Sequence, residues 1–91
     1  MEMKQLYSND YYKVIEVTLN GGEVMSQHKA TSDAFILVKE GIGKIIFQDN
    51  EVELQQGSTY MISANKEHRL HVTETFNACI IFAPGAEIKF L

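Results

Sequence analysis

Hydrophobic and polar residues alternate along most of this 91-residue chain, and this period of two limits its fold more than any other feature. Over residues 13–20, Ile15, Val17 and Leu19 are each followed by a polar residue. Such alternation is typical of a β-strand with one face in the core and the other in solvent. No segment has the 3.6-residue period of a long amphipathic helix. The pattern therefore predicts an all-β fold.

A second extended segment follows a Gly-Gly pair and covers residues 23–30. Strict alternation there places the side chains of Val24, Ser26, His28 and Ala30 on one face. A histidine among small and apolar residues raises the question of whether this chain binds a metal ion.

Residues 34–40 are apolar on both faces of the predicted strand, until Gly41 and Gly43 break it. A strand with two apolar faces is usually covered on both sides. We therefore expect a central strand here that ends at the glycines.

The clearest local structure in the sequence is a hairpin around the dipeptide at 49–50, an Asp-Asn pair that tolerates positive φ. Pairing outward from this loop places Phe47 opposite Val52 and Ile45 opposite Leu54. The hydrophobic residues of the two strands then share one face, so the predicted register is self-consistent.

The rest of the chain reads as further short strands separated by turns. After a turn at 64–66, a strand carries His68, Leu70 and Val72 on one face and His71 on the other. A Pro-Gly turn then precedes a terminal strand. Eight or nine short strands without a helix favour a sandwich or small barrel, and the length of the chain predicts a single domain over residues 1–91.

Charge and hydropathy exclude several classes of partner. The net charge is −4, with only eight scattered Lys and Arg residues, so we expect no nucleic-acid partner. The longest apolar runs fall far below the roughly 18 residues of a membrane span, so we expect no membrane partner and a cytoplasmic protein. Cys79 is the only cysteine, which excludes an intrachain disulfide and favours a role as a small buried hydrophobic residue.

Two glycine-anchored motifs, in order along the chain, resemble those of the cupin superfamily. The first runs from Gly22 through His28 to Gly41, and the second runs from Gly57 to His68. In the second motif, the usual glycine is replaced by an asparagine, a residue that also adopts the left-handed conformation.

The resemblance covers about residues 21–72 and implies a small double-stranded β-helix, a jelly-roll-like barrel. In cupins the first motif supplies two histidines and a glutamate, and the second motif supplies a further histidine. His28 and His68 match, but the second histidine falls on Ala30 and the glutamate falls on Ala34. The resemblance therefore leaves His28 and His68 as the metal-ligand candidates.

Two imidazoles alone make a weak metal site, because a catalytic divalent metal needs about three protein ligands. A third ligand would have to be Asp33, Cys79, Glu74 or an external anion. We therefore expect no tightly bound metal cofactor, with a divalent metal as the alternative.

The predicted ligand-binding residues are His28, His68, Ser26 and Tyr60, the last contributing a hydroxyl group at the mouth of the barrel. Ile36, Val38, Phe47 and Met61 are expected to enclose the cavity.

These residues predict a degenerate cupin that binds a small polar or anionic metabolite in the barrel lumen without tightly held metal. The competing hypothesis is a metal-dependent enzyme of the dioxygenase or isomerase type that uses both histidines and a non-standard third ligand. A third reading is an interaction platform with an inert lumen. Because no acidic residue is visibly placed to orient either imidazole, whether the protein is an enzyme stays undecided.

The two-faced strand over residues 34–40 also predicts self-association. If Ala34, Ile36 and Val38 face the lumen, then Phe35 and Leu37 face outward. Two large apolar side chains in water are unusual for so small a chain, so we expect a homodimer joined through this sheet.

Overall fold

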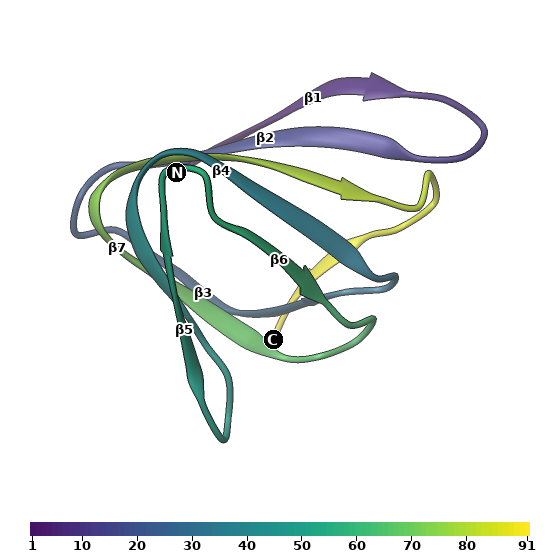
Figure 1. Ribbon diagram of the computed structural model, residues 1–91. Coiled ribbons are helices and arrows are strands. Elements are labelled where there is room, and N and C mark those ends of the chain that lie inside the picture. Colours follow the sequence, from purple (N-terminus) through teal and green to yellow (C-terminus); the bar gives the residue numbers. More distant parts are fainter.

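The computed structural model describes residues 1–91 and contains strands and turns but no helix (Figure 1). This confirms the all-β prediction. No helix is available to cross a membrane. The strands are β1 (Glu2–Ser8), β2 (Lys13–Leu19), β3 (Val24–Ala30), β4 (Ala34–Ile46), β5 (Glu51–Gln55), β6 (Thr59–Ile62), β7 (His68–Phe82) and β8 (Ile88–Phe90).

The long strands β4 and β7 organise the molecule, because each takes part in two antiparallel sheets. The first half of β4 and the second half of β7 lie in a sheet of order β1-β2-β7-β4-β6. Their remaining halves lie in a sheet of order β8-β3-β7-β4-β5. The result is the curled double-stranded β-helix of Figure 1, as the resemblance implied. The expectation of short strands throughout was wrong for these two.

The bend of β4 between the two sheets is at Gly41, whose φ is +91°. The register of β4 on β7 shifts between Val38 and Gly43, which lets the strand turn the corner while it stays paired. A Cβ atom on Gly41 would lie 2.7 Å from the Cα atom of Phe76. The glycines therefore bend the strand, and the prediction that they end it was wrong.

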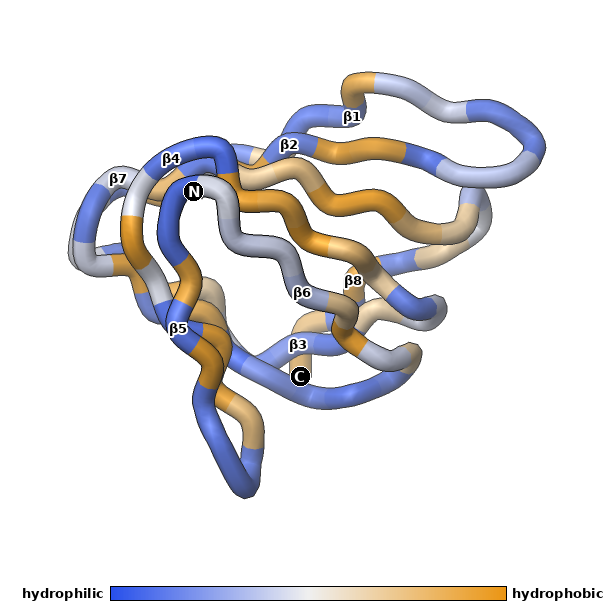
Figure 2. The backbone as a smooth tube through the Cα atoms, viewed as in Figure 1, coloured by the Kyte–Doolittle hydropathy of each residue, from blue (hydrophilic) through white to orange (hydrophobic).

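The core lies inside the curl, where Figure 2 shows the hydrophobic stretches of the central strands. Leu19, Phe76 and Ala78 are completely buried there. Val17 is also buried and Ile15 packs against the same cluster, which confirms the alternation predicted for this strand. The strand alternation thus places one side of each central strand in a common core.

The β4–β5 hairpin forms, but not in the predicted register. Ile45 pairs with Val52 rather than with the residue two positions further on. The Phe47 amide donates a 2.8 Å hydrogen bond to the Asn50 carbonyl, so the two-residue loop is 48–49. A shift of two residues leaves every side chain on its predicted face, so hydrophobic patterning does not distinguish the two registers.

The edge strand β1 was not predicted. It pairs only with β2, and every one of its residues is exposed. The turn between the two strands projects past the end of β7 (Figure 1), although β2 itself pairs with β7 along its whole length. Because β1 contributes nothing to the core, hydrophobic patterning gave no signal for it.

Candidate functional site

His28 reaches the interior because β3 contains a bulge. Met25 pairs with Leu70 and His28 pairs with His68, so β3 has one residue more than β7 between these pairs. The extra residue places both Met25 and His28 in the interior, where both are buried. The prediction that Ser26 faces inward was therefore wrong, because its side chain is exposed.

His68 begins β7 directly after a tight turn. Asn65 in this turn has a φ of 63°, so the left-handed conformation expected of it is confirmed. From His68 onward the strand alternates as predicted, with Leu70 buried and His71 half-buried on the opposite face.

The two predicted histidines come together although they lie forty positions apart. Their ring centroids are 4.2 Å apart, in an edge-to-face arrangement. Each residue is only 6% exposed. The rings of Phe90 and Phe47 lie 5.5 Å from His28 and 5.8 Å from His68, respectively. The pair is thus held among apolar side chains.

Both imidazoles are bonded to the main chain in the same way. Nδ1 of His28 donates to the carbonyl of Ser26 (2.6 Å), and Nδ1 of His68 donates to the carbonyl of Lys66 (2.8 Å). In each case the acceptor lies two residues earlier in the chain. A carbonyl oxygen only accepts, so the proton of each neutral ring is on Nδ1 and Nε2 carries a lone pair.

Burial keeps these rings neutral at pH 7. Loss of hydration lowers the pKa of His28 to about 4, and the neighbouring His68 adds to this effect. Burial also lowers the pKa of His68, with a further contribution from the positive charge of Lys66. The charge that would attract an anionic ligand is therefore absent near neutral pH.

The histidines line an apolar cavity of about 60 Å³, measured as the space open to the centre of a water-sized sphere. Thirteen of its fifteen lining residues are hydrophobic. Ala30 and Ala34, which occupy the two missing ligand positions, both lie in its wall. The volume is enough for roughly four water molecules.

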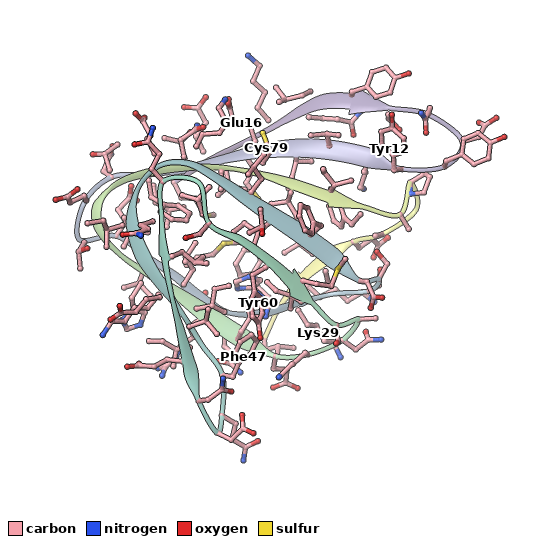
Figure 3. All side chains as sticks on the ribbon, viewed as in Figure 1. Tyr12, Glu16, Lys29, Phe47, Tyr60 and Cys79 are labelled. Atoms are coloured by element: carbon pink, nitrogen blue, oxygen red, sulfur yellow. The ribbon has the colours of Figure 1, made fainter.

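The other residues expected at the cavity are placed differently. Tyr60 is half-buried and packs against Phe47 (Figure 3), with the ring centroids 6.1 Å apart. It does not line the cavity. Of the four residues expected to enclose the cavity, only Ile36 lines it. Met61 is 54% exposed on the outer face of β6. Lining residues that the sequence did not reveal include Met25, brought in by the bulge, and Ile88 of the terminal strand.

None of the proposed third ligands reaches the histidines. Oδ1 of Asp33 accepts a hydrogen bond from the amide of Ala64 (2.8 Å). Cys79 is half-buried on the outer face beside Glu16 (Figure 3), and Glu74 is exposed. The chain contains no group of three or more His, Cys, Asp or Glu side chains able to hold one metal ion. Two imidazole nitrogens are thus its donor set, which does not fit a catalytic divalent metal.

Comparisons with known proteins agree with this architecture. Residues 15–85 match the Cupin_2 family, described as a cupin domain. A cupin-2 domain protein from Shewanella frigidimarina superposes with a TM-score of 0.77 at 26% identity, covering 88% of this chain and 78% of that one. A cupin superfamily protein from Desulfitobacterium hafniense gives a TM-score of 0.82 at 22% identity, covering 90% and 75% of the two chains.

Similar proteins with a named activity include L-ectoine synthases from Rhodococcus. L-ectoine synthase from Rhodococcus erythropolis is 31% identical over 71 residues, which are 76% of this chain and 54% of that enzyme. The chain thus spans about half the length of the curated relatives that it matches. With the family match, the shared fold and the paired histidines of the two motifs in agreement, the chain belongs to the cupin family.

Proposed function

We propose that this cupin binds a small molecule in the cavity beside His28 and His68, without a tightly held metal ion. The observation that carries the proposal is a buried pair of neutral imidazoles at the wall of an apolar cavity. Alanine side chains at the two remaining ligand positions leave space and supply no lone pair. An inert lumen is less well supported, because the interior is not fully packed.

The metal content of the protein tests this proposal. Protein purified without a histidine tag should contain far less than one equivalent of iron, manganese, zinc or nickel, because two nitrogen ligands hold such ions weakly. Elemental analysis by plasma mass spectrometry gives the ratio. One equivalent of any of these metals, retained through gel filtration, would contradict the proposal.

The second candidate is a metal-dependent enzyme. The similarity to L-ectoine synthase supports an enzymatic activity. In this alternative, His28 and His68 would supply two ligands and a non-standard group would supply the third. A retained stoichiometric metal would support this candidate and remove the first.

We further propose that the outer face of the β1-β2-β7-β4-β6 sheet pairs with a second copy of this chain. Phe35 is half-buried and Leu37 is 38% exposed, whereas Ala34, Ile36 and Val38 between and beside them are buried. The central strands are thus apolar on both faces, a pattern of sheets that are covered on both sides.

The strand pairing aligns these outward side chains into rows. We call the first row the apolar row. It crosses all five strands of the sheet and holds only large apolar side chains: Tyr7, Val14, Ile81, Phe35 and Met61.

The next row is mixed in charge, which favours a second copy as the partner. Lys4 pairs with Glu16, and Lys39 makes a 2.8 Å ion pair with the same carboxylate. A patch that carries both signs complements itself when rotated by a two-fold axis. From the strand spacing and the rise per residue, the face measures about 24 by 23 Å, an area of roughly 550 Å². This area is of the same order as the ~800 Å² that each partner buries in a stable interface.

Phe35→Asp should convert the dimer into a monomer, because it places a charge within the apolar row. Val24→Asp is the matched control, since Val24 is an exposed apolar residue on a strand of the other sheet. Light scattering coupled to gel filtration gives the mass of each variant. A Phe35→Asp protein that stays folded and dimeric would place the interface elsewhere.

We also propose a cytoplasmic location with neither a nucleic-acid nor a membrane partner. The net charge of −4 and the free thiol of Cys79 support this proposal.

A further inference from the structure

The cavity contains hydrogen-bond acceptors but no donors. The Nδ1–H group of each histidine is already used by a main-chain carbonyl, at 2.6 Å for His28 and 2.8 Å for His68. Nε2 of neither ring has a hydrogen-bond partner within the chain, and no side-chain nitrogen is both sealed from solvent and unpartnered. Each Nε2 lone pair therefore reaches open space.

Two different backbone irregularities hold the rings in this one tautomer. At His28, the bulge in β3 brings the carbonyl of Ser26 to the ring. At His68, the turn containing Asn65 does the same with the carbonyl of Lys66. The donor and acceptor positions are thus set by the main chain, and a ligand meets two lone pairs already in place.

An anionic ligand gains nothing from such a lining. A carboxylate that enters loses its hydration and meets two lone pairs and thirteen hydrophobic residues. A neutral molecule with a hydrocarbon body loses little hydration, and a single hydroxyl or N–H group on it finds an acceptor. Because the ring centroids are only 4.2 Å apart, one such group lies within reach of both rings.

We propose that the cavity takes a small, neutral, largely hydrocarbon molecule that carries one hydroxyl or N–H group, which donates to Nε2 of His28 or His68. This inference rests on the proposed lumen function and names the chemical class of its ligand. It replaces the polar or anionic metabolite expected from the sequence.

Three small probes separate the possibilities. Pyrrole and furan are rings of the same size that differ in having an N–H donor or an acceptor oxygen, and propionate is a small anion. We expect pyrrole to bind about tenfold more tightly than furan, the ratio that ~1.4 kcal/mol of hydrogen bonding gives. Propionate should not bind. Chemical-shift titration by NMR gives the three dissociation constants, and long-range ¹H–¹⁵N spectra report the tautomer of each histidine in the unliganded protein.

Three variants locate the effect. The double variant His28→Leu/His68→Leu removes both acceptors and should bring the pyrrole and furan affinities to within twofold. His71→Leu, on the opposite face of the strand, should leave the tenfold ratio. Ala34→Leu fills the cavity and should abolish binding of both rings.

The outcomes separate this inference from the function it rests on. Equal binding of furan and pyrrole, tighter binding of propionate, or Nε2–H tautomers would overturn the ligand class but leave a binding lumen. Failure of all three probes to bind would overturn both.

Discussion

Gly41→Ala should lower the free energy of unfolding by roughly 4 kcal/mol, or prevent folding altogether. The φ of +91° at Gly41 is costly for any residue with a Cβ atom. In addition, this Cβ would lie 2.7 Å from the Cα atom of Phe76, which belongs to the paired strand and is not able to swing away. Urea unfolding followed by circular dichroism measures the loss.

Gly57→Ala separates the backbone conformation from the close approach. Gly57 has a nearly equal φ of +86°, but a Cβ there meets no atom within 4 Å. Its replacement should therefore cost only about 1 kcal/mol. Equal losses in the two variants would show that the close approach of β7 to Gly41 adds nothing to the cost of the backbone conformation.

Acid should destabilise the protein by a comparable amount, and His28 is the main cause. Its pKa is about 4 in the folded protein and near 6.5 in the unfolded chain. Between these values the unfolded chain binds a proton that the folded protein does not, so stability is complete above pH 6.5 and falls as the pH drops to 4. The loss attributable to His28 is roughly 3 kcal/mol, and His68 shifts in the same direction.

Urea titrations test this pH dependence. They give the free energy of unfolding at pH 7.5, 6.5, 5.5 and 4.5, at one protein concentration. His28→Leu should reduce the slope of the profile over that interval and leave the smaller contribution of His68. His71→Leu removes an imidazole outside the cavity and should leave the acid loss in place. A wild-type profile without slope between pH 6.5 and 4.5 would mean that the ring of His28 is well hydrated.

The structural features that depend on hydrophobic alternation and on motif spacing were predictable from the sequence. The buried face of β2 follows from the alternation of Val17 and Leu19 with polar residues, and the motif spacing paired His28 with His68 across forty positions. The left-handed turn at Asn65 was also predictable, because asparagine adopts this conformation readily.

Other features depend on tertiary contacts that leave no local signal. The bulge in β3 lies at Ser26 and Gln27, which contain none of the glycine that often marks such a site, so alternation assigned Ser26 to the wrong face. The bend at Gly41 depends on how closely β7 approaches this residue. In other settings a glycine at such a position ends the strand, so the sequence alone does not distinguish a bend from an end. Tyr60 and Met61 were both expected at the cavity, and neither lines it. Met61 lies on the outer face because the inward face of so short a strand is set by its pairing with β4.

Strand β7 is a wall only one backbone layer thick between the cavity and the outer face of the sheet. Ile80 lines the cavity, and the next residue, Ile81, lies in the apolar row outside. A molecule that displaces this wall from within also reshapes the surface on which a second copy would rest. With the proposed ligand and the proposed dimer, occupancy and self-association would be thermodynamically linked, and each would change the equilibrium constant of the other by the same factor.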